Sequence, residues 1–97
     1  MLPPATAITL AQRATRSDDA LFQEVGGEAV LLDLASEKYF GLDPVGTRIW
    51  NLLGEDGHLQ SVYEHICSEY DAEPDLVASD LLALIDQLAE AGLVKLS

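Results

Sequence analysis

The architecture of this chain depends most on the segment Glu28-Ala-Val-Leu-Leu-Asp-Leu-Ala-Ser-Glu-Lys-Tyr-Phe-Gly-Leu-Asp-Pro-Val-Gly-Thr-Arg-Ile-Trp50. Its two apolar runs, at 30–34 and 39–42, are separated by a polar stretch and predict two antiparallel strands joined by a turn. Asp43 followed by Pro44 predicts the start of a helix, because Asp caps free N–H groups and Pro fits the first helical position. The segment therefore predicts a hairpin that leads directly into a helix.

The flanking sequence extends this pattern on both sides. Residues 21–25 predict a further strand, and Gly26-Gly27 predicts a tight hairpin turn, because both positions tolerate positive φ. Helices are expected at about 44–53, 59–70 and 74–91, from apolar residues at helical spacing. We therefore expect an α+β, winged-helix-like domain in which a three-stranded antiparallel sheet is followed by three helices.

The N-terminal segment carries little core character. We expect a flexible arm at residues 1–19 and a single domain at 20–97, a size that one hydrophobic core can support. Within the arm, Ile8 and Leu10 are expected either to add a short strand or to lie over the surface of the domain.

The charge of the chain restricts its partners. Seventeen acidic residues oppose five basic ones, the formal net charge is −12, and no Lys or Arg lies between Arg48 and Lys95. Such a surface repels phosphate backbones and anionic lipids, so we expect neither a nucleic acid nor a membrane as partner. The acidic surface favours a partner with basic residues. The alternative interpretation is that the acids only keep a small protein in solution. The single cysteine, Cys67, cannot form an intrachain disulfide, which fits a cytoplasmic location.

The residues that usually carry catalysis are sparse. The only histidines are His58 and His65, and no further Cys or His joins Cys67 to complete a metal shell. Gly26-Gly27 turns into a strand instead of a helix and so does not form a phosphate-binding loop. We therefore expect no enzymatic activity, no metal site and no cofactor.

The helix expected at 74–91 has an unusually wide apolar surface. One row is an ordinary core stripe, formed by Val77, Leu81, Leu84 and Leu88. A second apolar row lies beside it and is bordered by Asp86; it is formed by Ala78, Leu82, Ile85 and Ala89. Two interpretations stay open: the helix is buried on two sides by neighbouring elements, or the second row lines a groove.

The expected architecture and the charge together favour a binding module. A winged-helix-like shape usually suggests DNA binding, but the helix that would read bases here carries acids and no base, at Asp75, Asp80, Asp86 and Glu90. A DNA-binding regulator is therefore disfavoured. The strand at 39–42, at the edge of the sheet, has unpaired backbone groups that can accept an extended peptide as an added strand.

Five segments, taken in order, resemble the PqqD-type proteins: Glu-Ala-Val-Leu-Leu-Asp-Leu at 28–34, Lys-Tyr-Phe-Gly-Leu-Asp at 38–43, Val-Gly-Thr-Arg-Ile-Trp-Asn-Leu-Leu at 45–53, Glu-Tyr-Asp-Ala-Glu-Pro at 69–74 and Leu-Ala-Glu-Ala-Gly-Leu-Val at 88–94. These proteins, also called RiPP recognition elements, are chaperones of ribosomally made, modified peptides. The similarity covers about Ala20 to Val94. The Tyr-Phe-Gly-Leu-Asp segment is more similar to the proteins of lasso-peptide pathways than to those of the coenzyme PQQ pathway.

The resemblance implies that the chain binds the leader peptide of a precursor as an added strand, in the cleft between the third strand and the third helix. It implies no catalysis, because the leader is presented to a separate modifying enzyme such as a leader peptidase, a cyclase or a radical SAM enzyme. The contacts would fall on Lys38, Tyr39, Phe40 and Gly41 and on Leu82, Ile85, Asp86 and Ala89, with Ala78 completing the apolar row. The alternative is a structural adaptor that binds only a protein partner.

Two positions depart from the family pattern. Glu37 stands in the hairpin turn where a Gly is common, which is expected to strain the turn or change its type. His58 stands where a Thr or Ser cap is usual, so the second helix is expected to start less firmly.

Overall fold

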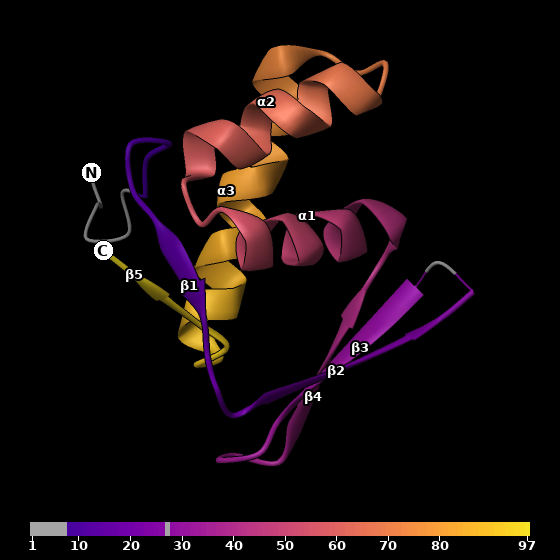
Figure 1. The fold of residues 1–97 in the computed structure, drawn as a ribbon, viewed down its shortest axis with the longest axis vertical. Helices are drawn as coiled ribbons and strands as arrows, with labels where there is room; N and C mark the ends of the chain where they lie inside the picture. Colours follow the sequence, from indigo (N-terminus) through magenta and orange to yellow (C-terminus); the bar gives the residue numbers. More distant parts are fainter. Residues whose placement is uncertain (1–7, 27) are drawn as a thin grey trace.

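The computed structural model of the chain describes residues 8–26 and 28–97 (Figure 1). The elements in order are β1 (Ala14–Arg16), β2 (Ala20–Val25), β3 (Glu28–Asp33), β4 (Lys38–Leu42), α1 (Pro44–Glu55), α2 (Leu59–Glu69), α3 (Pro74–Glu90) and β5 (Val94–Leu96). The expected α+β class is confirmed, since the three-stranded antiparallel sheet β2-β3-β4 is followed by three helices.

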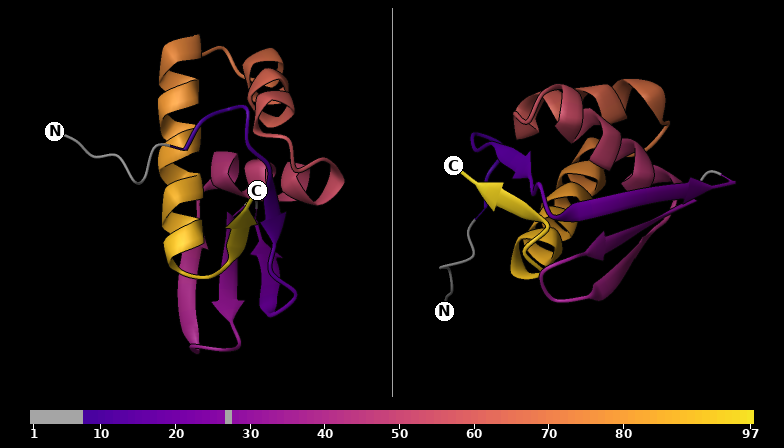
Figure 2. Two further views of the ribbon diagram at one scale, coloured as in Figure 1. Left: turned by 90° about the vertical axis from the view of Figure 1, so that its left-hand side faces the viewer. Right: turned by 60° about the horizontal axis from the view of Figure 1, so that its bottom comes forward.

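The sheet has β3 at its centre and β2 and β4 at its edges. Leu31 of β3 lies opposite both Phe22 of β2 and Phe40 of β4, which fixes the register of all three strands. The β3 residues on this face, Ala29 and Leu31, are buried against the helices, whereas the alternate residues point to the outer face. The sheet therefore has a face that supports the core and a face that the helices leave uncovered (Figure 2).

The turn between β2 and β3 agrees with the glycine pair in the sequence. Val25 pairs with Glu28, so the hairpin closes through two residues, and Gly26 has a φ of 64°. Gly27 lies outside the described residues.

The helix start predicted at Asp43 is confirmed. The Oδ1 atom of Asp43 accepts a hydrogen bond of 2.7 Å from the backbone N–H of Gly46, and Pro44 occupies the first turn. Behind this cap, α1 buries an apolar face in the core, at Ile49, Trp50, Leu52 and Leu53.

The second helix begins without a side-chain cap, as the His58 position suggested. Asp56 supports this helix start instead, because its Oδ1 atom accepts from the backbone N–H of His58 at 3.1 Å and lies 2.9 Å from Nδ1 of the His58 ring. These hydrogen bonds lower the pKa of Asp56 to about 2.

A second, two-stranded sheet joins the two ends of the described chain. β1 pairs antiparallel with β5, Ala14 is fully buried, and its N–H donates to the carbonyl oxygen of Gly57 at 2.8 Å. The segment that we expected to be an arm, 1–19, thus contains a strand, and only its residues 1–7 lie outside the described part. The division of the chain at residue 20 stays a prediction.

Of the helices in the described part of the chain, none has the length and apolar character needed to cross a membrane.

Candidate functional site

A groove runs between β4, the start of α1 and the outer side of α3. Among the described strands β4 pairs with β3 alone, so alternate backbone N–H and C=O groups on its other side have no strand partner in this part of the chain. In Figure 2 (left) β4 is the strand of the sheet nearest to α3. The groove has a volume of about 530 Å³ and is lined by Phe40, Gly41, Leu42, Asp43, Val45, Gly46, Ile49, Asp80, Ala83, Leu84 and Gln87.

The strand contributes both an apolar wall and an accessible backbone. Phe40 is half-buried in the wall and Leu42 is buried beneath it. Gly41 is exposed, and a Cβ added at this position would meet no atom within 4 Å. The middle of the strand edge is therefore free of side-chain bulk, which lets another backbone come close.

One flank of α3 forms the opposite wall. Its residues follow the helical spacing i, i+3, i+4, i+7, so they form one row on the surface; we call Asp80, Ala83, Leu84 and Gln87 the groove flank. The core stripe lies next to this row and is buried, at Val77, Leu81, Ile85 and Leu88. The groove flank thus borders the core stripe; its central residue Leu84 is half-buried, and Asp80, Ala83 and Gln87 are exposed.

The structure does not bring the α3 residues expected from the sequence to this groove. Ile85 is fully buried in the core stripe. The other four are half-buried on the far side of that stripe; we call Ala78, Leu82, Asp86 and Ala89 the covered flank. We expected Leu84 in the core stripe and Ile85 in the second apolar row, and the structure has them the other way round. The reason is that the buried centre of the helix lies between Leu81 and Ile85.

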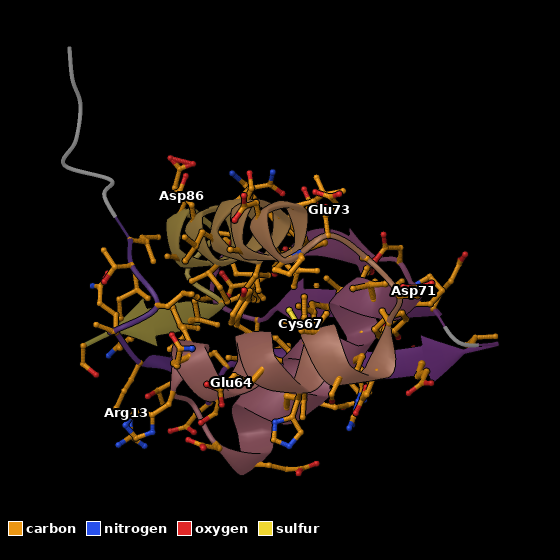
Figure 3. All side chains as sticks on the ribbon, turned by 90° about the horizontal axis from the view of Figure 1, so that it is seen from above. Arg13, Glu64, Cys67, Asp71, Glu73 and Asp86 are labelled. Atoms are coloured by element: carbon orange, nitrogen blue, oxygen red, sulfur yellow. The ribbon has the colours of Figure 1, made fainter. Side chains whose placement is uncertain are left out.

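The chain before β1 explains why the second apolar row of α3 exists. Residues 8–13 pass beside α3 before the chain enters β1 (Figure 2, left), and Figure 3 shows Asp86 pointing outward from this helix. Ile8 and Leu10 are half-buried against the core, as are Leu82 and Ala89. The interpretation of α3 as a helix packed on two sides therefore agrees with the structure.

The strand residues expected at the site divide between the two faces of the sheet. Phe40 and Gly41 line the groove. Tyr39 lies on the outer face and is 75% exposed, and Lys38 is exposed at the first position of β4. Of the residues expected from the sequence, Phe40 and Gly41 thus line this groove, and its helix side is formed by other residues of α3, Asp80, Ala83, Leu84 and Gln87. Which residues contact a leader stays a prediction.

A small apolar pocket of about 160 Å³ continues the groove at the α1 end. It shares Val45, Ile49 and Asp80 with the groove and is completed by Ile66, Tyr70, Ala72, Leu76, Val77 and Leu81; we call it the upper pocket. Val45 and Leu76 are large apolar residues that stay exposed at its wall. An exposed apolar hollow of this kind is suited to a large apolar side chain.

An ion pair joins the two helices beside the upper pocket. Nε and Nη2 of Arg48 on α1 donate to the two carboxylate oxygens of Glu69 on α2, at 2.8 and 2.6 Å. The pair raises the pKa of Arg48 and lowers the pKa of Glu69, in each case mainly through this hydrogen bonding. It fixes the end of α2, which leads into Tyr70 and the pocket wall.

A third apolar area lies on the outer face of the sheet, away from the helices. Leu21, Val25, Val30 and Tyr39 are 44–75% exposed there, on three adjacent strands. Contiguous exposed apolar surface of this kind marks interaction sites. This outer face meets the groove at Gly41, which lines hollows on both sides.

The chemistry that the groove offers is therefore an accessible backbone edge, apolar walls and two carboxylates. Of these carboxylates, Asp43 is engaged in the helix cap, whereas Asp80 is exposed. Elsewhere in the described residues, no group of three or more His, Cys, Asp or Glu side chains is arranged to hold a metal ion.

Comparison with known proteins agrees with this geometry. The family model described as Coenzyme PQQ synthesis protein D (PqqD) matches residues 28–94. The solved structure "TbiB1 in Complex with the TbiA(beta) Leader Peptide" is 37% identical, with 84% of this chain and 94% of that chain covered and a TM-score of 0.78. A second, "Lasso peptide synthetase B1 complexed with the leader peptide", shares the fold at 24% identity, 86% and 98% coverage and a TM-score of 0.70.

A search of curated proteins finds no match. The family match extends over more than half of the chain, from the first residue of β3 to the first residue of β5. The chain therefore belongs to the PqqD family.

Proposed function

We propose that this member of the PqqD family binds the leader region of a ribosomally synthesised precursor peptide and presents it to a separate modifying enzyme. The leader docks as an added strand on β4, in the groove beside α3. The protein itself acts without catalysis, in the cytoplasm. A lasso-peptide precursor is the proposed substrate class, since both similar structures are named as complexes with leader peptides and one is a lasso peptide synthetase component.

The unpaired edge of β4 is the observation that carries this proposal. A strand that adds to this edge gains main-chain hydrogen bonds along the length of β4, and these bonds do not depend on the peptide sequence. Gly41 leaves room for its backbone at the centre of the edge. A sheet edge that is unpaired, accessible and bordered by an apolar helix flank is the arrangement that strand addition requires.

Side chains of the added strand would alternate between two environments. Those that point inward lie between Phe40 and Leu84, and one beyond the end of β4 reaches the upper pocket. Those that point outward extend the outer face of the sheet next to Tyr39. We propose that the modifying enzyme docks on this outer face, because its apolar residues are exposed in the described structure.

The test is a calorimetric titration of the purified protein with two synthetic peptides. One is the TbiA(beta) leader, and the other is the leader of the small precursor gene nearest to the gene of this chain. Saturable binding of at least one is expected, with NMR amide shifts concentrated in β4 and on the groove flank. No saturable binding of either peptide would contradict the proposal, and capture of an enzyme without any leader dependence would favour the adaptor alternative.

A matched pair of variants on β4 sharpens this test. Phe40→Ala removes an inward, half-buried wall residue and is expected to weaken leader binding about tenfold, equivalent to about 1.4 kcal/mol. Tyr39→Ala removes a neighbouring ring that points to the outer face and is expected to change leader affinity less than about twofold. Equal losses for both variants would contradict docking on the helix side of the sheet.

A further inference from the structure

Asp80 occupies a particular position on α3. It lines both the groove and the upper pocket, so its carboxylate stands where the two hollows meet. It is exposed, and its neighbours at this junction, Val45 and Ile49, are apolar. A peptide that fills both hollows must therefore pass this carboxylate.

The charge around Asp80 is uncompensated. The residues that line the groove and the upper pocket include Asp43 and Asp80 but no Lys, Arg or His. Asp43 already accepts the hydrogen bond that caps α1. Within the described residues Asp80 has no cationic side chain within ion-pair distance, and the nearby Arg48 is paired with Glu69. Asp80 is thus an acidic side chain on the path of the peptide that no described basic side chain pairs with.

We propose that Asp80 selects a Lys or Arg in the leader, at the position between the residue in the upper pocket and the residues paired with β4. This inference rests on the proposed function and specifies the ligand that the groove prefers. A cation there forms a charge-assisted hydrogen bond with the carboxylate, and its aliphatic stem packs against Val45 and Leu84. The same position rejects Asp and Glu by like-charge repulsion.

The experiment scans the tighter-binding of the two leader peptides with Lys and with Glu at each position in turn. Each peptide is titrated against the wild-type protein, Asp80→Lys and Asp86→Lys. Asp86→Lys is the matched control, because it makes the same charge change on the same helix but on the covered flank (Figure 3). Thermal unfolding of each variant establishes that it is folded.

The expected result is one leader position at which Lys binds about tenfold more tightly than Glu, the product of an attraction and a repulsion of about threefold each. This preference is expected to invert in Asp80→Lys, to persist in Asp86→Lys and to shrink as salt is raised. Saturable binding with no position that inverts in Asp80→Lys would overturn the role of Asp80 and leave leader binding intact. Equal inversion in both variants would also overturn it, since the overall negative charge of the protein, and not a contact with Asp80, would then explain the preference. Absence of saturable binding by any peptide would overturn the proposed function together with this inference.

Discussion

The two flanks of α3 have similar compositions and different environments. The two flanks lie on either side of the same buried stripe, and each combines apolar side chains with one acid. The groove flank consists of Asp80, Ala83, Leu84 and Gln87, and the covered flank consists of Ala78, Leu82, Asp86 and Ala89. The groove flank faces a strand whose edge pairs with no other described strand. On the covered flank, Leu82 and Ala89 are half-buried against the core, as are Ile8 and Leu10 in the segment that passes beside α3 (Figure 2). Composition alone therefore does not tell which flank of a helix receives a ligand; the neighbouring elements decide it.

The comparison of the flanks predicts that equivalent substitutions differ in their effect on leader binding. Leu84→Asp places a charge in the wall of the groove and is expected to weaken leader binding about a hundredfold, or about 2.7 kcal/mol, because the carboxylate must be desolvated against the peptide. Leu82→Asp is expected to leave leader affinity within about threefold of wild type and to lower the free energy of unfolding by about 2 kcal/mol, because it loses contact with the core. Calorimetry and urea unfolding measure the two effects.

The control for this pair is the stability of Leu84→Asp. Leu84 is half-buried against the core, as Leu82 is, so this variant is also expected to lose about 2 kcal/mol of unfolding free energy, and the two variants are expected to differ in leader binding alone. If Leu82→Asp abolished binding while retaining its fold, the assignment of the peptide to the groove flank would be wrong. The apolar row expected from the sequence would then be the contact surface.

The burial of the covered flank depends on how firmly β1 is attached to the domain, which a substitution at Gly57 tests. A Cβ at Gly57 would lie 2.6 Å from the backbone oxygen of Ala14, so Gly57→Ala must displace β1 from the loop that precedes α2. We expect this variant to lose about 2 kcal/mol of stability, measured by urea unfolding, and to expose the covered flank to hydrogen exchange. Leader affinity is expected to stay within about twofold, since β1 does not line the groove.

Gly54→Ala is the matched control for Gly57→Ala. The three atoms nearest to its added Cβ would all belong to the guanidinium of Arg16, the flexible end of a side chain whose Cζ lies 5.4 Å from the centroid of the Trp50 ring. Because Arg16 can move and Ala favours the helix, we expect a change in stability of less than about 0.5 kcal/mol. Equal destabilisation by both variants would show that the contact between Gly57 and Ala14 has no special role in holding β1.

The sequence predicted local structure better than the environment of each element. The strands 30–34 and 39–42, the cap at Asp43 and all three helices followed from spacing and turn chemistry within short windows. β1 did not, because three residues with one buried side chain show no alternation, and its partner β5 is separated from it by most of the chain. The flank of α3 that borders the groove could not be read from the sequence for the same reason, since it depends on contacts distant in sequence.

Substitutions in the turn between β3 and β4 are expected to have the smallest effect on stability. They test whether the backbone of Glu37 is strained. Glu37 has a φ of 61°, in the left-handed region that costs a residue with a Cβ about 1 kcal/mol, as the absence of a Gly there suggested. The turn is held from the other side by Asp33, which accepts from Ser36 Oγ at 2.7 Å and from the Ala35 N–H at 3.3 Å. Glu37→Gly keeps these hydrogen bonds and relieves the strain, but it also raises the conformational entropy of the unfolded chain, which opposes folding.

The net expectation for Glu37→Gly is a gain of about 0.5 kcal/mol in the free energy of unfolding, measured by urea titration. Glu37→Asn is expected to gain slightly less, because Asn tolerates positive φ, and Glu37→Val to lose about 1 kcal/mol, because a β-branched residue does not. Leader affinity is expected to be unchanged in all three, since Glu37 lies outside the groove lining. A gain in Glu37→Val equal to that in Glu37→Gly would show that the charge of Glu37, and not its backbone conformation, limits this turn.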